Sequence, residues 1–457
     1  MNLNLFKYFF IALIVGLIIA GIYIIYIKDD GSGKSSAVES KEINMTREIS
    51  IGIIDFDTVN PILTKNLEIS QLTKLVYEPL VNVSQDFRIE PGLASECSKL
   101  DELTYIMKLD ENKKWADGDK ITFDDIEFTI NTIKTVDTIY NENVQPIERI
   151  EKIDENTLKI YLVEATDFFE YYLCFPIMQK KTYNEEIPIG SGGVTISEVN
   201  EKKIIFEGDK IRLIAKIYKS ATELYNNFTR GNIDLMITQN TDYEKYIGNM
   251  GYEKNLIPGR DFYYISCDNI KDIEFRKYIN ENINKEKINF ELNNNQYIIA
   301  NFPLDYGSFL NSEKKEKSTS TKSYKKRRIS LSTEVETKEI AKLIKEQLKE
   351  KGITVNIQNY VNKNADLIIK KEKILITPDI RQYLKNTEEL NKIVKIENKD
   401  VLKEEYKKVI GEYYNNMPFI SLYFNSYIIL HNNKLKGDFT GNWYNIFYNI
   451  DTWYKVI

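Results

Sequence analysis

The residues of this chain that could perform acid–base, nucleophilic or metal chemistry are few and widely spaced. Among 457 residues His431 is the only histidine, and the cysteines are Cys97, Cys174 and Cys267. One imidazole excludes multi-histidine metal sites and argues against histidine-based catalysis. Three distant cysteines give neither a disulfide framework nor a metal cluster. We expect no catalytic centre, no metal and no cofactor, and we expect His431, beside two asparagines, to be a solvated turn residue.

Carboxylates are plentiful, with 68 Asp and Glu against 62 Lys and Arg, which gives a formal net charge of −6. Scattered carboxylates do not define a catalytic pair, so an enzyme is the weakest of the function classes that we consider. Nucleic-acid binders are normally basic, so the charge also argues against a nucleic-acid partner. The 31 tyrosines could line a ligand cleft, although compositional bias explains them more simply.

Two short motifs have structural interpretations that are simpler than chemical ones. Ile189-Gly190-Ser191-Gly192 could cradle a phosphate, but its spacing fits no nucleotide motif and no helix follows at once. Ser220 and Glu223 stand three residues apart before an apolar pattern, which predicts a capping box at the start of a helix.

The elements that would position a site are most clearly encoded between residues 75 and 134. Thr104–Leu109 alternates polar and apolar residues, as a half-buried strand does. Thr122 stands three residues before Asp125, which predicts a capped helix start, and Ile126, Ile130 and Ile133 follow at helical spacing. This stretch therefore predicts strands, turns and one helix.

The rest of the chain predicts an alternation of strands and helices. We expect strands at 211–218, 233–237, 262–266, 353–357 and 367–377, and helices at 220–231, 272–288, 336–351 and 404–414. Gly231 and Gly352 follow two of these helices and are typical helix ends. Such an alternation indicates an α/β fold.

The order of these pieces resembles the signature of the family 5 extracellular solute-binding proteins of ABC importers, the oligopeptide- and dipeptide-binding group. The matching residues are Tyr77, Leu80, Val81, Pro91, Gly92, Leu93, Ala94, Trp115, Asp117, Gly118, Thr122, Asp125, Ile126 and Phe128. Cys97 stands where the family usually has a tryptophan. The resemblance continues to Trp453 and covers nearly all of the chain from Ile49.

This resemblance implies a two-lobed, periplasmic-binding-protein-like α/β fold (type II, cluster C style) with an extra small subdomain. The implied domains are a large lobe of residues 48–75, 182–260 and 425–457, a subdomain of residues 76–181, and a shortened second lobe of residues 261–424. The second lobe includes a low-complexity basic segment, 311–328. We expect this segment to be a mobile surface loop, with attraction to anionic lipid or wall polymer as the alternative.

An apolar run of 20 residues, Tyr8–Ile27, precedes the globular part. Its length suits a transmembrane helix, so we expect a signal anchor over residues 1–28, a flexible tether over 29–47, and a single-pass membrane location. No cysteine precedes Cys97, so a lipid-modified cysteine next to the run is not expected. The extracytoplasmic position of the body rests on the resemblance.

The resemblance also implies ligand-binding residues. Thr58 and Asn60 belong to a loop that reaches the cleft between the lobes in the family, although Asn60-Pro61 could equally be only a turn. In the second lobe, Ile376, Thr377 and Asp379 fall near the family's aromatic residue and the aspartate that pairs with the α-amino group of a peptide. The alternative for Asp379 is a helix cap.

The implied function is capture of a short peptide between two lobes that close on it, followed by delivery to the permease subunits of an ABC transporter. Nickel or another small solute is an alternative ligand, although one histidine makes direct metal ligation less attractive. A second class of function is a degenerate paralogue that acts as a membrane-tethered peptide sensor or interaction protein without transport. The absence of a lipid anchor, the shortened second lobe and the missing cleft aromatic favour that class.

Overall fold

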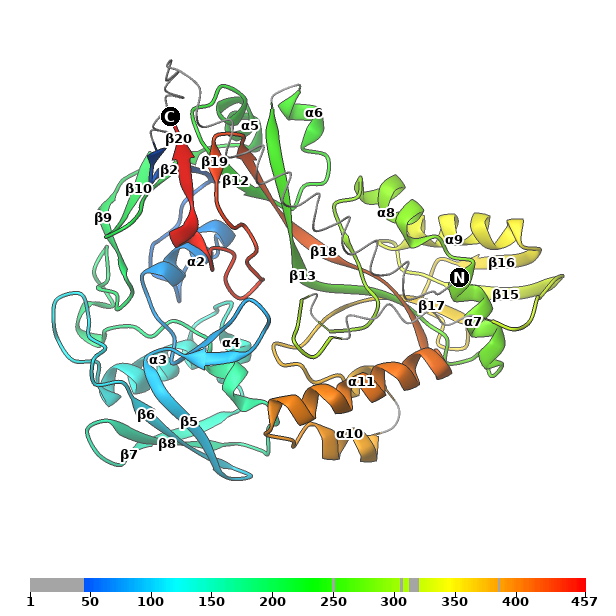
Figure 1. Ribbon diagram of the computed structural model, residues 1–457, viewed down its shortest axis with the longest axis horizontal. Helices are drawn as coiled ribbons and strands as arrows, with labels where there is room; N and C mark the ends of the chain where they lie inside the picture. Colours follow the sequence, from blue (N-terminus) through cyan, green and yellow to red (C-terminus); the bar gives the residue numbers. More distant parts are fainter. Residues whose placement is uncertain (1–44, 249–250, 305–306, 312–319, 385–386) are drawn as a thin grey trace, which may run out of the picture. The chain divides into compact units, whose positions relative to one another are not determined.

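The computed structural model describes residues 45–248, 251–304, 307–311, 320–384 and 387–457 (Figure 1). The predicted anchor, nearly all of the predicted tether, and residues 312–319 of the basic segment lie outside these ranges. None of the helices within them combines the length and the apolar character that crossing a membrane requires. Arg327 and Arg328, predicted as part of the loop, are the first residues of a strand.

An eleven-stranded mixed sheet is the framework of the described chain. Its main path runs β16-β15-β17-β13-β18-β12-β2-β11-β10-β9, and β14 pairs with β18. The strands are β2 (Glu48–Ile54), β9 (Val194–Val199), β10 (Lys203–Gly208), β11 (Arg212–Tyr218), β12 (Leu235–Thr238), β13 (Tyr252–Ser266), β14 (Ile298–Ile299), β15 (Arg327–Ser332), β16 (Ile353–Gln358), β17 (Leu367–Lys373) and β18 (Phe419–Asn432). β2 is parallel to β11 and β12 and fully buries Ile49, Ile51 and Ile53, as strands covered on both faces do.

Two large hydrophobic cores lie along this sheet, and two smaller buried clusters accompany them. The first includes β2, β11 and the smaller sheet described below, and the second is built from residues between Phe262 and Phe424. The long antiparallel strands β13 and β18 pass from one core to the other, since Ile257 belongs to the first and Phe262 to the second (Figure 1). Two cores joined by two strands form two lobes. The finer division into numbered domains stays a prediction.

The strands bend where the cores change. The β13–β18 register shifts between Pro258 and Phe262, and the backbone N–H of Asp261 donates to Asn425 Oδ1 at 2.9 Å. A Cβ on Gly259 would lie 2.3 Å from that same oxygen. Glycine is therefore required here for close approach of the two strands.

The smaller sheet has the order β5-β6-β8-β7. It and the helix beside it confirm the strand predicted at Thr104–Leu109 and the helix predicted after Thr122. Its strands are β5 (Ala94–Asp101), β6 (Thr104–Leu109), β7 (Ile147–Lys152) and β8 (Thr157–Leu162). Helix α3 (Phe123–Thr135) begins with a complete capping box between Thr122 and Asp125. Ile126, Ile130 and Ile133 are buried in the first core, as their spacing predicts.

Other predicted helices form with altered details. Ser220 caps α5 (Ala221–Thr229), but the Glu223 carboxylate accepts the N–H of Lys219, so the predicted reciprocal capping box is only half formed. The helix predicted over 272–288 is two helices, α7 (Ile273–Glu281) and α8 (Lys285–Asn293), because the Asn284 side chain accepts the Lys287 N–H and starts a new one.

His431 corrects the sequence analysis most clearly. It lies in β18 and is fully buried, instead of occupying a solvated turn. Its ring nitrogens lie 3.1 Å from the backbone oxygen of Asn432 and 3.1 Å from Oδ1 of Asn255, and the ring stacks on Phe439. Burial lowers the pKa of His431, which suits a neutral structural imidazole.

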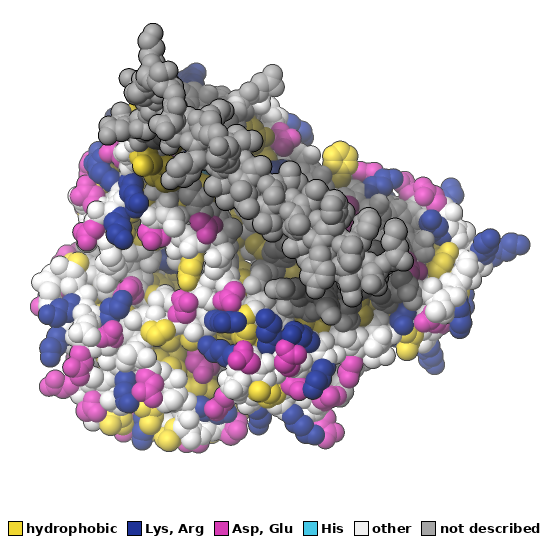
Figure 2. All heavy atoms as spheres, in the orientation of Figure 1, with side chains coloured by type: hydrophobic (Ala, Val, Ile, Leu, Met, Phe, Trp, Pro, Cys, Tyr) yellow, Lys and Arg dark blue, Asp and Glu magenta, His cyan; other side chains and the backbone are white. Residues whose placement is uncertain are grey.

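The remaining elements cover the sheets or connect them. They are α2 (Leu67–Leu72), α4 (Asn141–Val144), α6 (Glu244–Ile247), α9 (Lys338–Glu350), α10 (Thr387–Ile393), α11 (Lys399–Asn416), η1 (Thr73–Leu75), η2 (Phe169–Leu173), η3 (Lys180–Thr182), η4 (Arg381–Tyr383), η5 (Ile450–Thr452), β1 (Met45–Thr46), β3 (Val81–Val83), β4 (Ile89–Pro91), β19 (Leu435–Lys436) and β20 (Tyr454–Val456). On the described surface in Figure 2, acidic and basic side chains are mixed.

Candidate functional site

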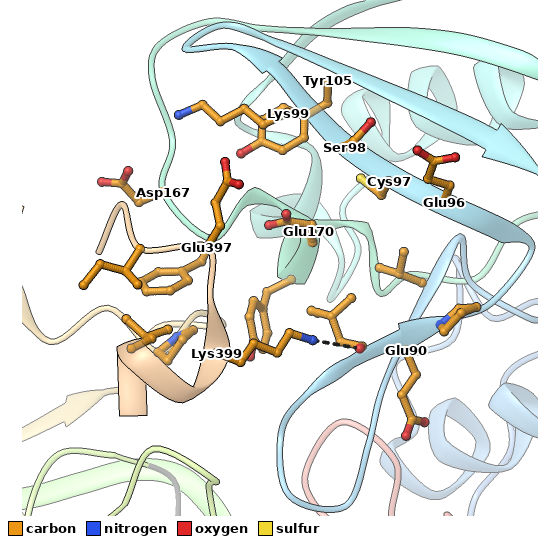
Figure 3. A pocket seen from close by; sticks show the side chains of 18 of the residues that line it. Glu90, Glu96, Cys97, Ser98, Lys99, Tyr105, Asp167, Glu170, Glu397 and Lys399 are labelled. Carbon is orange, nitrogen blue, oxygen red and sulfur yellow. Dashed lines mark hydrogen bonds between the residues drawn. The ribbon is translucent and has the colours of Figure 1, made fainter. Parts of the chain in front are cut away.

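A cavity of about 460 Å³ lies between the small sheet and elements of the second lobe (Figure 3). Strands β4 and β5 and the turn η2 form one wall, and residues 394–399 with the start of α11 form the other. The charged lining residues are Glu90, Glu96, Lys99, Asp167, Glu170, Lys395, Glu397 and Lys399, and the aromatic ones are Tyr105, Phe168, Tyr171 and Phe309. A second cavity, of about 490 Å³, shares Phe309 with the first.

The wall that carries Glu170 is fixed by aromatic packing. Phe168 adopts the left-handed conformation with φ 57°, which is uncommon for a residue other than glycine, and η2 begins at the next residue. Phe169 is fully buried against Tyr105, with ring centroids 4.7 Å apart, and Tyr171 Oη donates to the Phe87 carbonyl at 2.6 Å. Glu170 is held between these anchors and projects into the cavity (Figure 3).

The opposite wall is fixed by a helix cap. The Asn398 side chain accepts the backbone N–H groups of Asp400 and Val401, each at 3.1 Å, which makes Lys399 the first residue of α11. Lys399 Nζ donates to the carbonyl of Ile89 across the cavity at 3.4 Å. The two walls are therefore joined by a hydrogen bond whose donor–acceptor distance is long, so the bond is weak.

Half of the charged groups that line the cavity have ionic partners, and Glu90 instead accepts the Tyr448 hydroxyl at 3.2 Å. Among the carboxylates, Glu96 pairs with Lys108 at 2.8 Å and Asp167 pairs with Arg381 at 2.8 Å. Lys99 and Lys395 both pair with Glu102, at 3.2 and 3.6 Å. Within the described residues, Glu170 and Glu397 form no ion pair.

Burial controls the protonation of the deepest groups. It raises the pKa of Glu170, an effect to which Glu397 adds and which Lys399 and Lys99 oppose. Burial also raises the pKa of the Cys97 thiol far above its usual range, with further contributions from Glu170 and Glu96. Cys97 is therefore a neutral thiol and not an activated nucleophile. The arrangement can bind a ligand.

Arg260 makes a second connection between the lobes. Its Nη atoms donate to the Glu142 carboxylate at 3.0 and 2.9 Å, its Nε donates to the carbonyl of Ile374 at 2.9 Å, and the guanidinium lies 4.7 Å from the ring centroid of Trp443. The side chain is only 12% exposed. One guanidinium therefore joins α4, the end of β17 and the loop before η5.

The predicted loop residues Thr58 and Asn60 form a turn. Thr58 Oγ1 accepts the Asn60 N–H, and Asn60 Oδ1 accepts the Ile62 N–H at 3.0 Å. Asn60 is buried, and its Nδ2 donates to the carbonyl of Tyr183. Both side chains are thus engaged in holding the backbone, which agrees with the turn interpretation. Their contact with a ligand stays a prediction.

The predicted second-lobe residues lie beside the cavity without lining it. Ile376 and Thr377 are buried, and the Ile376 carbonyl accepts the Tyr444 hydroxyl. Both carboxylate oxygens of Asp379 accept hydrogen bonds from the Arg381 guanidinium, and Oδ1 also accepts the backbone N–H of Arg381 at 2.9 Å. Arg381 thus occupies the position in which an ammonium group would meet Asp379. Pro378 is the residue of this segment that lines the cavity.

The sequence analysis did not single out Glu170, which lies in the aromatic-rich stretch 168–175, or Lys399. A charged residue inside an aromatic run is a signal that could have identified Glu170. Lys399 carries no comparable signal, because its position depends on a helix that begins five residues earlier than predicted. Within the described residues, no group of three or more His, Cys, Asp or Glu side chains is arranged to hold a metal ion.

Comparison with known proteins gives a family match. A model described as bacterial extracellular solute-binding proteins, family 5 Middle, matches residues 88–379. Putative binding proteins of Brucella melitensis and Brucella abortus are each 24% identical to this chain over 235 residues, which is 42% of this chain. The match spans only 38% of the length of these relatives.

Solved structures share the fold at low identity. An ABC transporter substrate-binding protein, CtaP of Listeria monocytogenes, is 18% identical and superposes with a TM-score of 0.65 over 91% of this chain and 100% of its own. NikZ of Campylobacter jejuni, solved with Ni(L-His), is 18% identical with a TM-score of 0.56 over 90% and 99%. The oligopeptide-binding protein AppA of Bacillus subtilis, solved with a nonapeptide, is 18% identical with a TM-score of 0.54 over 89% and 98%.

Proposed function

We propose a solute-capturing function for this chain, which belongs to the family 5 bacterial extracellular solute-binding proteins, because that family's model matches residues 88–379. The protein holds a small ligand between its lobes and delivers it to the permease subunits of an ABC transporter. The ligand that we propose is a short peptide. It binds the ligand without making or breaking bonds.

The cavity between β5 and α11 is the observation that carries this proposal. Its walls come from residues that are about 300 positions apart in the sequence and that pack in different cores, such as Ala94 in the first and Leu402 in the second. A ligand in this space contacts both lobes at once. It therefore favours the closed arrangement over an open one by its contacts with the second wall.

The size and lining of the cavity support a short peptide as the ligand. About 460 Å³ is in the range of small-molecule sites, and the walls combine apolar and aromatic side chains with a few charged ones. Two structural relatives were solved in complex with a nonapeptide and with Ni(L-His). Because no described group of side chains suits a metal, a peptide fits this chain better than a bare metal ion.

The location forms part of the same proposal. The apolar run Tyr8–Ile27 would tether the binding domain to the cell membrane as a single-pass segment, with the domain on the extracytoplasmic face. Protease protection in spheroplasts of cells that express the full chain tests this topology. Digestion of the binding domain from outside is the expected result, and its protection would contradict the proposed location.

The capture function is tested by ligand retention and stabilisation. Native mass spectrometry of the protein purified from residue 45 onward should show a bound population of solutes. A library of peptides and small solutes should contain members that raise the melting temperature, since a ligand at 100 times its Kd adds about 2.7 kcal/mol of stability. A protein that carries no solute and is stabilised by none would overturn the proposal.

The alternative is a tethered peptide sensor or interaction protein without transport. The contacts of Asp379 favour this alternative. Its carboxylate binds Arg381, whereas in the peptide-binding role implied by the family it would bind the amino group of the ligand. Uptake of a labelled ligand by cells with and without the gene separates the two. Equal uptake together with measurable binding would assign the alternative.

A further inference from the structure

The Glu170 carboxylate is partly buried and has neither an ion pair nor a hydrogen bond to another described residue. Glu90, the other partly buried carboxylate of the cavity without an ion pair, accepts the Tyr448 hydroxyl at 3.2 Å. Glu96 and Asp167 line the same space, but each is bound by a cation, Lys108 and Arg381 respectively. Glu397 is also without an ion pair among the described residues, but it is exposed to solvent. A buried charge is costly unless it is paired, so Glu170 is a group that gains from a partner.

The lysines around Glu170 do not supply that partner. Lys99 and Lys395 are both engaged with Glu102, and Lys399 donates to the Ile89 carbonyl. Figure 3 shows Glu170 between Cys97 on one wall and Glu397 and Lys399 on the other. Within the described residues no cation forms an ion pair with Glu170, so a ligand can supply one.

The surrounding walls favour an organic cation. Tyr105, Phe168 and Tyr171 line the cavity around Glu170, and aromatic rings attract ammonium groups. The cavity is also large enough for an attached chain of several heavy atoms. A carboxylate and aromatic rings together bind an ammonium group by ion pairing and by cation–π attraction.

We propose that Glu170 binds a primary ammonium group of the ligand, so that the cavity selects amine-bearing solutes. This inference rests on the proposed capture function and adds the group that the ligand must carry. The ammonium group can come from the amino terminus of a peptide or from an alkyl amine. Asp379, for which the sequence implied this role, is occupied by Arg381.

Matched probes and one isosteric variant test the inference. Trialanine amide is compared with N-acetyltrialanine amide, and 1,5-diaminopentane with 1,5-pentanediol, by calorimetric titration of the protein from residue 45 onward. Each is titrated into the wild type, Glu170→Gln and the control Glu151→Gln. The control removes a carboxylate of the small sheet that lies outside the cavity lining and pairs with the protein's own Arg149.

The expected result is that an amine probe binds the wild type and the control about tenfold to a hundredfold more tightly than it binds Glu170→Gln. The uncharged member of that pair should bind all three proteins equally. Binding of trialanine amide alone assigns a peptide amino terminus, and binding of the diamine assigns an alkyl amine. The circular-dichroism spectrum of Glu170→Gln should equal that of the wild type. Glu170 forms no ion pair among the described residues, so its replacement breaks none.

Two outcomes would overturn the inference. One is equal affinity of the amine probes for the wild type and Glu170→Gln. The other is failure of every amine probe to bind the wild type. Neither outcome removes the capture function, which stands if the acetylated peptide or another uncharged solute is retained and fails only if no solute binds at all.

Discussion

At the scale of single residues, the partner of a carboxylate decides what the carboxylate can do. Asp379 and Glu170 both lie near the cavity, and the sequence pattern implied a ligand role for Asp379 alone. In the folded protein Arg381 binds Asp379 and Asp167 together, whereas Glu170 is half-buried without an ion pair in the described chain. The residue with capacity to bind a cation is the one that the pattern did not mark.

Glu170→Gln is expected to raise the melting temperature of the ligand-free protein at pH 7. Burial raises the pKa of Glu170 in the folded state, so the folded protein binds a proton more readily than the unfolded chain does. The wild type therefore gains stability as the pH falls through the raised pKa, and the advantage of the variant should be smaller at pH 4.5, the ordinary pKa of a glutamate, than at pH 7. Scanning calorimetry at both values measures this.

The control for this experiment is Glu96→Gln, which removes an exposed ion pair with Lys108 and is not expected to raise the melting temperature at pH 7. Lys399, Lys99 and Glu397 are the charged groups that face Glu170, and all three are unchanged in both variants. An equal or lower melting temperature for Glu170→Gln at pH 7 would contradict the prediction.

At the scale of elements, Asp234 joins four strands of the framework. Its carboxylate accepts the N–H and hydroxyl of Ser50 in β2, at 2.9 and 2.8 Å, and it stands directly before β12. It also accepts from Asn432 at the end of β18 and from Lys455 in β20, each at 3.0 Å. Asp234 itself is buried.

Asp234→Ala is expected to lower the free energy of unfolding by about 3 kcal/mol, because it leaves Lys455 and the Ser50 donors without their acceptor. Urea denaturation measures the change. Asp242→Ala is the control, since Asp242 forms an exposed i,i+3 pair with Lys245 and its loss should cost less than about 0.5 kcal/mol. Similar losses for both variants would show that Asp234 is not the junction described.

The elements also show how far local sequence reasoning extends. Thr104–Leu109 and the helix after Thr122 form as predicted because their signals are local: a polar–apolar alternation, and a cap that acts over three residues. The predicted helix 272–288 breaks because Asn284 offers the backbone a competing cap. The candidate site was predictable only in part. Its second wall is the start of α11, which meets Ile89 through Lys399 although the two residues are 310 positions apart, and no local pattern indicates such a contact.

At the scale of the whole described chain, two strands carry the connection between the cores. Gly259 in β13 lies against Asn425 in β18, and that asparagine also accepts the Asp261 N–H. The contact lies where the register of the two strands shifts. Any relative movement of the two lobes therefore requires β13 and β18 to bend or twist where they cross.

Gly259→Ala is expected to destabilise the protein by about 1–3 kcal/mol, because the new Cβ overlaps Asn425 Oδ1 and the asparagine cannot move away without losing its hydrogen bond. The double variant Gly259→Ala/Asn425→Ala should cost less than the sum of the two single changes. Urea denaturation of all four proteins gives this coupling. Strict additivity would argue against the contact.

Arg260→Met is expected to cost about 2 kcal/mol, since it removes the charge-assisted bonds to Glu142 and Ile374. Hydrogen exchange should quicken around Glu142 and at the end of β17, which the guanidinium holds together. Arg149→Met is the control in the small sheet, where Arg149 pairs with Glu151 at an exposed site. Unchanged exchange at residues near Glu142 in Arg260→Met would refute the connection.

The sequence by itself determined the local elements, the α/β class and the family, because these depend on spacing and on interactions within a few residues. Only the tertiary structure decided which polar groups are paired. The buried His431 ring contacts Asn255, which is 176 positions away, through a hydrogen bond. Arg381 forms ion pairs with both Asp379 and the distant Asp167. Charge pairing and burial arise between segments far apart in the chain, so a pattern can mark a residue while the fold determines whether it is available to a ligand.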